Sequence, residues 1–134
     1  MKFSTRTTYG LRAMIYLARD YDSQKTVSLS QIAKDEHISL AYLERLIALL
    51  KRDGLVQSAK GKTGGYRLID KPSLIDVFRI VKTLEGNVVP FHCIDADGRV
   101  KCAQVANCGA SSVLMNVYVA ISKTLKEMKL SELL

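Results

Sequence analysis

Residues 28–54 of this chain read SLSQIAKDEHISLAYLERLIALLKRDG, which predicts two short helices separated by a turn of about three residues. Ser28 and Gln31 have the spacing of a capping box, so the first helix is expected to open there and to stop near Glu36. His37 lies in the turn, at a place where a left-handed backbone often uses glycine. Ser39 can cap the second helix. The apolar residues that would lock the two helices together are Leu29, Ile32, Ala33, Ile38, Leu43, Leu46 and Ile47.

The helix pair is followed by a predicted β-hairpin. Gly54 supplies the stop of the second helix, and residues 55–58 and 66–69 are short strand-like runs. The residues between them, AKGKTGG at 59–65, form a basic and glycine-rich hairpin tip. Two helices followed by a basic hairpin are the pattern of a winged helix-turn-helix domain.

Amphipathic helices flank this unit. Residues 7–20 predict an upstream helix that buries Leu11, Met14, Ile15 and Ala18. Pro72 and Ser73 are expected to open a helix that ends at Gly86 and faces the core with Leu74, Val77, Ile80, Val81 and Leu84. Residues 112–128 predict a long helix with one apolar face formed by Leu114, Val117, Ile121, Leu125 and Met128. The predicted fold is mainly α with a small β-hairpin wing, divided into a winged helix-turn-helix domain (1–86), an irregular cysteine-bearing segment (87–111), and a dimerisation helix with its tail (112–134).

The helix pair and the hairpin predict DNA binding. A helix enters the major groove, about 12 Å wide, when a short turn and a supporting helix hold it out from the body. The outer start of the second helix then supplies the candidate DNA-binding residues Ser39, Ala41, Tyr42, Glu44 and Arg45. Lys60 and Lys62 can neutralise phosphates or reach the minor groove, and Arg67 can assist from the strand. The alternative is an ordinary helical scaffold whose lysines serve solubility, with Glu44 either a solvated charge or an acceptor for a cytosine amino group.

The charge distribution agrees with an anionic partner. The chain has 134 residues and a formal net charge of +7 at pH 7, and residues 1–70 hold twelve Lys or Arg against seven Asp or Glu. Nucleic acid, an acidic membrane and an acidic protein all fit such a charge. The opening residues contain no apolar leader-like run, and no stretch approaches the roughly 20 apolar residues of a membrane span. We therefore expect a cytoplasmic protein that has no membrane partner.

Three motifs resemble a known family: YGLRA at residues 9–13, ISLAYLE at 38–44 and GGYRL at 64–68. With them the chain resembles the winged-helix transcription regulators that include the iron–sulfur regulator IscR, the nitric-oxide sensor NsrR and the cysteine-metabolism regulator CymR. The resemblance covers nearly the whole chain. It implies a homodimer crossed through the long carboxy-terminal helix, and a set of three clustered cysteines between that helix and the winged domain.

Cys93, Cys102 and Cys108 fall within sixteen residues, and an odd number in an apparently unexported chain argues against a disulfide framework. Thiolates suit the iron of iron–sulfur clusters, and the spacing is compatible with a loop bent around a two-iron or a four-iron cluster. The resemblance favours the cluster, because the cysteine-metabolism branch of the family lacks this trio. The alternatives are bare thiol chemistry and a zinc site completed by His92.

The fourth cluster ligand departs from the family pattern. Regulators of the IscR type have a histidine three residues after the last cysteine, where this chain has Ser111. Nitric-oxide sensors of the family use an aspartate in the first helix, at the position of Thr8 in this chain. His92, Asp95, Asp97, an external thiol or water are the remaining candidates.

The sequence therefore predicts a sequence-specific DNA-binding transcriptional regulator, most simply a repressor, that binds a double-stranded operator as a homodimer. An iron–sulfur cluster on Cys93, Cys102 and Cys108 would control its operator affinity. The rival is a cluster-free regulator of the same fold that is controlled by thiol oxidation, zinc or a protein partner. An enzyme is not expected, because His37 and His92 form no recognisable catalytic set.

Overall fold

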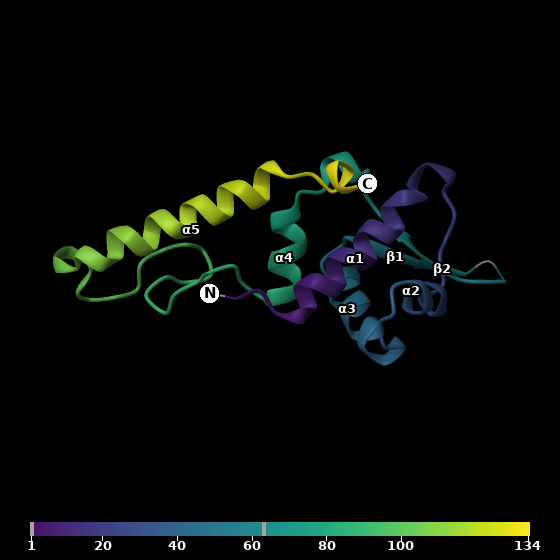
Figure 1. The fold of residues 1–134 in the computed structure, drawn as a ribbon, viewed down its shortest axis with the longest axis horizontal. Coiled ribbons are helices and arrows are strands. Elements are labelled where there is room, and N and C mark those ends of the chain that lie inside the picture. Colours follow the sequence, from purple (N-terminus) through teal and green to yellow (C-terminus); the bar gives the residue numbers. More distant parts are fainter. Residues whose placement is uncertain (1, 63) are drawn as a thin grey trace.

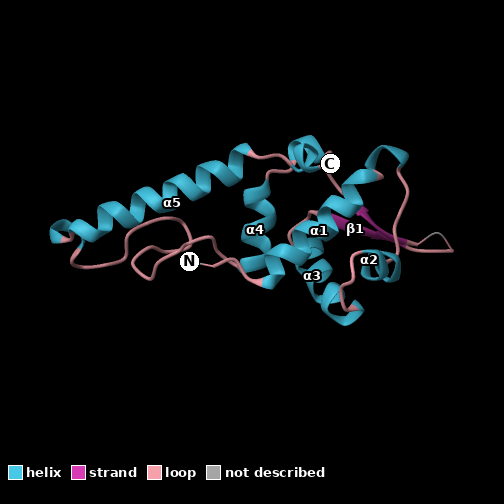
Figure 2. Cartoon of the chain, in the orientation of Figure 1, coloured by secondary structure: helices cyan, strands magenta, loops and turns pink. Residues whose placement is uncertain are grey.

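The computed structural model describes residues 2–62 and 64–134, so Met1 and Thr63 of the predicted hairpin tip lie outside the described residues. The chain is mainly helical with one antiparallel pair of strands, as predicted (Figure 1 and Figure 2). The helices are α1 (Thr5–Arg19), α2 (Leu29–Asp35), α3 (Leu40–Arg52), α4 (Val77–Glu85) and α5 (Gly109–Glu127), and the strands are β1 (Val56–Ala59) and β2 (Gly65–Leu68). Short 3₁₀ helices cover Tyr21–Ser23, Pro72–Leu74, Val105–Asn107 and Leu130–Leu133.

One hydrophobic core joins α1, α3 and α4. Its fully buried side chains include Met14, Leu43, Leu46, Ile47, Leu50, Ile80 and Leu84. Helices α1 and α4 approach each other closely at Gly10, where an added Cβ would lie 2.3 Å from Leu84 Cδ1. This apolar core fixes the position of α3, which is the predicted reading helix.

The end of the chain returns to the winged domain after α5. Val77 N donates to Met128 O at 2.9 Å, and Leu130 N donates to Ile75 O at 2.9 Å. Both Ile75 and Leu130 are fully buried. The residues after α5 therefore pack into the core of the winged domain, whereas α5 itself extends away from that domain (Figure 1).

Helix α5 leaves much of its apolar surface uncovered. Within this fully described helix, Ser122 is the one buried residue. Val113 and Val119 are 62% and 53% exposed. Near its end α5 packs against α4, with Lys126 Nζ 4.8 Å from the ring centroid of Phe78. No helix in the described parts of the chain is long and apolar enough to cross a membrane.

The helix predicted to open at Pro72 and Ser73 begins later. A 3₁₀ turn covers Pro72–Leu74, and α4 starts at Val77 after the N-cap Asp76, whose Oδ1 accepts the Arg79 N–H at 2.8 Å. Leu74, predicted to face the core, is 69% exposed. The prediction was wrong because an aspartate three residues further on caps the helix more effectively than the Pro-Ser pair, and because Ile75 takes an extended conformation.

Other predicted boundaries shift by a few residues. Helix α1 begins before residue 7, α5 begins at Gly109 rather than at residue 112, and both strands are displaced by one residue from the predicted runs. Ser39 occupies the N-cap position of α3, but its side chain makes no capping hydrogen bond with the described residues. Ser28 does cap α2, since its Oγ accepts the Gln31 N–H at 3.2 Å.

Candidate nucleic-acid interface and cysteine segment

The turn before α3 is fixed by backbone hydrogen bonds. Ile38 N donates to Ala33 O at 2.9 Å and His37 N donates to Lys34 O at 3.4 Å, which is the bond pattern of a Schellman motif. His37 has a φ of 52°, so it takes the left-handed position that glycine usually fills. Two hydrogen bonds of the same pattern end α3, where Gly54 has a φ of 72°. The carboxyl ends of α2 and α3 are thus both closed by local geometry.

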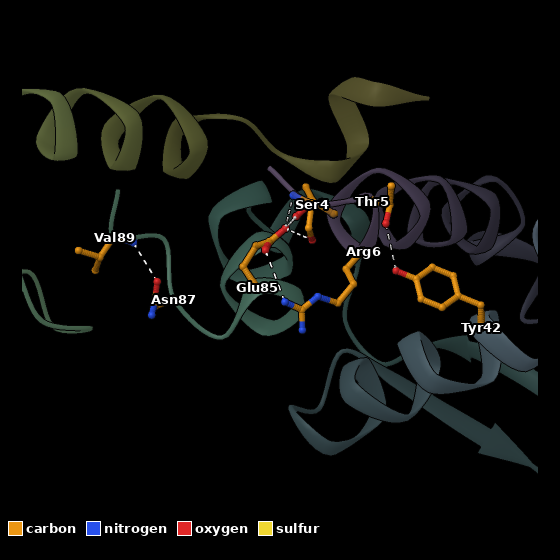
Figure 3. A network of polar contacts seen from close by, with 8 residues as sticks. Ser4, Thr5, Arg6, Tyr42, Glu85, Asn87 and Val89 are labelled. Atoms are coloured by element: carbon orange, nitrogen blue, oxygen red, sulfur yellow. Dashed lines mark hydrogen bonds and ion pairs between the residues drawn. The ribbon is translucent and has the colours of Figure 1, made fainter. Parts of the chain in front are cut away.

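Four of the five candidate residues at the start of α3 are exposed: Ser39, Ala41, Glu44 and Arg45. Tyr42 is half-buried and packs edge-to-face on Tyr9, with the ring centroids 5.9 Å apart and the planes at 85°. The Tyr42 hydroxyl lies 3.4 Å from Thr5 Oγ1 (Figure 3). Tyr42 therefore ties the start of α3 to the first turn of α1, a contact that the sequence pattern did not reveal.

Arg12 adds a second link between α1 and the helix-turn-helix. Its guanidinium carbon lies 5.7 Å from the ring centroid of Tyr9, and its Nε donates to Glu36 Oε2 at 2.8 Å. The sequence alone does not indicate this ion pair, because Arg12 and Glu36 are far apart in the chain. Helix α1 thus holds the turn and the start of α3 from one side.

The predicted wing is a short hairpin whose register pairs Val56 with Leu68 and Ala59 with Gly65. Lys60 and Lys62 lie at its end, and both are exposed. Neither lysine forms an ion pair within the described residues. The wing is attached to the body through Val27.

Val27 pairs with β2 on the edge that is not paired with β1. Its N–H donates to Tyr66 O at 2.9 Å, and Tyr66 N donates to Val27 O at 2.8 Å. A Cβ on Gly65 would lie 2.5 Å from Val27 O, so the glycine permits this close approach. Arg67 is half-buried and its Nη1 donates to Gln24 Oε1 at 3.3 Å, which directs it to the loop before α2.

Arg79 of α4 joins the end of α3 to the base of the wing. Its Nη2 donates to Asp53 O at 3.1 Å and to Gly54 O at 3.3 Å, and its Nη1 lies 3.3 Å from Asp70 Oδ2. No sequence signal marks this residue, because two of its three acceptors are backbone carbonyls on a distant turn. Arg79 fixes where the reading helix ends relative to the hairpin.

Part of the cysteine segment forms a hairpin that the sequence did not predict. Asp95 N donates to Arg99 O at 2.8 Å, and Lys101 N donates to Cys93 O at 2.9 Å. These bonds flank the antiparallel bridge between Ile94 and Val100. Cys93 therefore lies across the hairpin from Lys101, the residue that precedes Cys102 in the chain.

The tip of this hairpin rests on α5. Gly98 has a φ of 80°, and an added Cβ would lie 2.6 Å from Tyr118 Cε1. A glycine is needed here both for the left-handed backbone and for the close approach of the tyrosine ring. The cysteine segment is therefore in direct contact with the helix predicted to form the dimer.

The three cysteines are free and half-buried. They do not converge in this conformation, since no group of three or more His, Cys, Asp or Glu among the described residues can hold a metal ion. The thiols are suitable donors for an iron–sulfur cluster, but their positions would have to change to hold one. The assignment of Cys93, Cys102 and Cys108 as ligands stays a prediction.

The candidates for the fourth ligand differ in their surroundings. Asp95 Oδ1 accepts the N–H groups of Asp97 and Arg99, each at 2.9 Å. The pKa of Asp95 lies below its usual range, chiefly because its carboxylate accepts the Arg99 N–H. Burial acts in the opposite direction, and the hydrogen bond from the Asp97 N–H lowers the pKa further. The Asp95 carboxylate is thus engaged in its own turn, whereas His92 is exposed.

Comparison with known proteins places these features in a family. A family model described as Rrf2, iron-dependent transcriptional regulator, matches residues 3–134. The HTH-type transcriptional regulator CymR of Bacillus subtilis (strain 168) is 39% identical over 101 residues, which cover 75% of this chain and 72% of that protein. The structure of CymR, described as the global cysteine regulator of B. subtilis, is similar with a TM-score of 0.81 and 30% identity over 99% of this chain and 95% of that one. The structure of T. potens IscR is similar with a TM-score of 0.78 and 32% identity over 99% of this chain and 85% of that one.

These similarities confirm the resemblance inferred from the three sequence motifs, and with it the winged helix-turn-helix fold with a long carboxy-terminal helix. They also confirm that no enzymatic activity is to be expected, because the matching family consists of regulators. The chain therefore belongs to the Rrf2 family of DNA-binding, winged-helix transcriptional regulators.

Proposed function

We propose that this protein is a cytoplasmic repressor that binds a roughly palindromic operator as a homodimer, and that an iron–sulfur cluster on Cys93, Cys102 and Cys108 sets its operator affinity. The observation that carries the proposal is the position of three free thiols in the one segment that connects the winged domain to α5. A ligand bound there would lie in the segment that connects the reading unit to the helix that would join two such units.

The DNA-reading part of the proposal rests on exposure and charge. Ser39, Ala41, Glu44 and Arg45 lie exposed at the start of α3, where base edges would be read. Lys60 and Lys62 project from the hairpin without an ion pair in the described residues, so they are available for phosphates. Tyr42 and Arg67 are half-buried and would act mainly by positioning their elements.

The homodimer rests on the uncovered face of α5. A solvated monomer would leave Val113 exposed together with the half-buried Val117 and Ile121, which follow it at intervals of four residues on the same face of the helix. A second copy of α5 packed on this face would cover them in a self-complementary contact. Two reading helices would then present themselves to half-sites about 34 Å apart, one turn of the DNA.

The cluster rests on the donor set and on the family. Three thiols in a short segment suit iron, and the matching family model is described as iron-dependent. When bound, such a cluster supplies chemistry that responds to iron supply and oxidants.

The test is anaerobic reconstitution of the wild type and of the variants Cys93→Ala, Cys102→Ala and Cys108→Ala. The proposal expects iron and sulfide in the wild type, a visible absorption band that each variant weakens, and different operator affinities with and without the cluster. Equal operator affinity of the two forms, or no uptake of iron, would refute cluster sensing.

A cluster-free regulator is the second candidate, and the similarity to the structure of CymR, described as a cysteine regulator, supports it. In that case thiol oxidation, zinc or a partner protein would set operator affinity. Metal analysis of protein isolated without added metal tests for zinc. Titration with a thiol oxidant in the absence of iron tests for thiol control, which each of the three cysteine variants would then alter.

A further inference from the structure

Glu85 is the last residue of α4, yet its carboxylate reaches the first turn of α1 (Figure 3). Ser4 donates its N–H and its hydroxyl to Glu85 Oε1 at 2.9 Å and 2.6 Å, and the Thr7 hydroxyl donates to the same oxygen. Arg6 Nη2 lies 3.9 Å from Glu85 Oε2. Thr7 is buried and the Glu85 side chain is only 16% exposed, so this network is largely shielded from water.

The position of this charge is unfavourable for α4 and favourable for α1. A negative charge at the carboxyl end of a helix opposes the dipole of that helix, whereas at an amino end it is stabilising. Helix α1 has no acidic residue in its first turn, and the side chain of its N-cap Ser4 makes no capping hydrogen bond of the usual kind with the described residues. From a distant part of the chain, Glu85 thus supplies the amino end of α1 with the hydrogen-bond acceptor and the negative charge that its own first turn lacks.

The first turn of α1 also touches the reading helix. Thr5 Oγ1 lies 3.4 Å from Tyr42 Oη, and one turn later Tyr9 packs against the Tyr42 ring. Tyr42 is the third residue of α3, next to the exposed Ala41 and Glu44. The first turn of α1 therefore lies between Glu85 and the residues predicted to read bases.

The other side of Glu85 is the start of the cysteine segment. Gly86 has a φ of 84° and turns the chain out of α4, and Asn87 Oδ1 then accepts the Val89 N–H at 3.3 Å. Glu85 and Asn87 line a cavity of about 220 Å³ together with Val89 and with Ile121 of α5. The carboxylate thus stands where α1, α5 and the cysteine segment meet.

We infer that Glu85 is a positioning residue for DNA reading. It holds the first turn of α1 and, through Thr5 and Tyr42, the start of α3 in a fixed position relative to the cysteine segment. The part of this inference that concerns sensing rests on the proposed function. The part that concerns operator discrimination does not, since it depends on the contact of Glu85 with Ser4 and on that of Thr5 with Tyr42.

The experiment compares the wild type with Glu85→Gln, Glu85→Asp and the exposed control Glu132→Gln on two duplexes, an operator selected in vitro by the wild type and an unrelated sequence of the same length. Glu85→Gln is expected to weaken operator binding about tenfold, within the usual range of coupling between sites, and to leave binding to unrelated DNA unchanged. Glu85→Asp keeps the charge and should recover part of the loss. Glu132→Gln should match the wild type.

Thr5→Val provides a test that does not depend on the folding of the Glu85 variants, because Thr5 is exposed. It removes the hydroxyl that contacts Tyr42 and should lower the ratio of operator to unrelated binding in the same direction. An unchanged ratio in both Glu85→Gln and Thr5→Val would overturn the inference. An equal loss on both duplexes would also overturn it, because that result means a loss of folded protein or of phosphate contacts.

The measurements on reduced, cluster-free protein separate this inference from the proposed function. If the wild type binds its operator equally with and without the cluster, cluster sensing fails. The ratio of operator to unrelated binding in Glu85→Gln still decides the positioning role. If the wild type does respond, Glu85→Gln should reduce the difference in affinity between the two states. A full wild-type response in Glu85→Gln would refute its part in sensing.

Discussion

Replacing Lys60 and Lys62 by alanine tests whether the hairpin is a DNA-binding wing. Both lysines are exposed at the end of the hairpin, and neither is engaged in an ion pair within the described residues. Their removal should therefore cost little folding stability, since exposed lysines away from partners contribute little. The expected effect is confined to DNA binding and to its dependence on salt.

The magnitude follows from the number of lysines that a dimer presents. Each phosphate contact contributes about 0.9 to the slope of log affinity against log salt. Four lysines in two wings would contribute about 3.6, and one contact per wing would contribute about 1.8. A change of about 3.6 in slope alters the ratio of wild-type to variant affinity roughly 150-fold between about 50 and 200 mM salt.

Fluorescence anisotropy of an operator duplex and of an unrelated duplex, each at several salt concentrations, measures this slope. The double variant should weaken binding to both sequences, because phosphate contacts carry no direct sequence information. The charge-matched control is Lys101→Ala with Lys123→Ala, two exposed positions on the cysteine segment and α5 rather than on the hairpin. A double wing variant with the wild-type slope, or a control with an equally reduced slope, would refute the assignment of the wing.

Three further predictions follow from packing and charge. Val117→Asp should convert the dimer to monomers in analytical ultracentrifugation, because it places an unpaired carboxylate on the apolar face of α5. A wild type that sediments as a monomer at micromolar concentration would contradict the dimer. Ser122→Ala should raise the free energy of unfolding by about 1 kcal/mol in denaturant titration, because the buried Ser122 hydroxyl has no hydrogen-bond partner in the described residues. A lower stability of Ser122→Ala would contradict this prediction. Burial disfavours the charged form of Glu85, but the hydrogen bonds from Ser4 and Thr7 and the charge of Arg6 outweigh it and hold the pKa of Glu85 below its usual range. Its contribution is therefore present above the ordinary pKa of a glutamate and lost as the pH falls through the lower, folded value, so the stability difference between the wild type and Glu85→Gln should shrink on acidification.

Local features of the fold followed from the sequence where the responsible residues are neighbours. The side chain of Ser28 caps α2 through an N–H three residues away, and Gly54 ends α3 by taking a left-handed conformation. His37 does the same at the end of α2 without being a glycine. The predicted start of α4 was wrong because Pro72 and Asp76 both favour the start of a helix. The choice between them depends on the buried position of Ile75 beside Leu130. That position depends on residues at the far end of the chain.

The sequence by itself determined the helix pair, the basic hairpin, the long apolar helix and the clustering of three cysteines in one segment. These properties depend on periodicity and on short-range hydrogen bonding, which neighbouring residues decide. Only the tertiary structure decided that Tyr42 packs on α1, that Glu85 accepts the Ser4 N–H at the start of α1, and that Cys93 pairs with Lys101 across a hairpin. These features arise from contacts between residues distant in sequence and from strand register, where a shift of one residue reverses the face of a side chain.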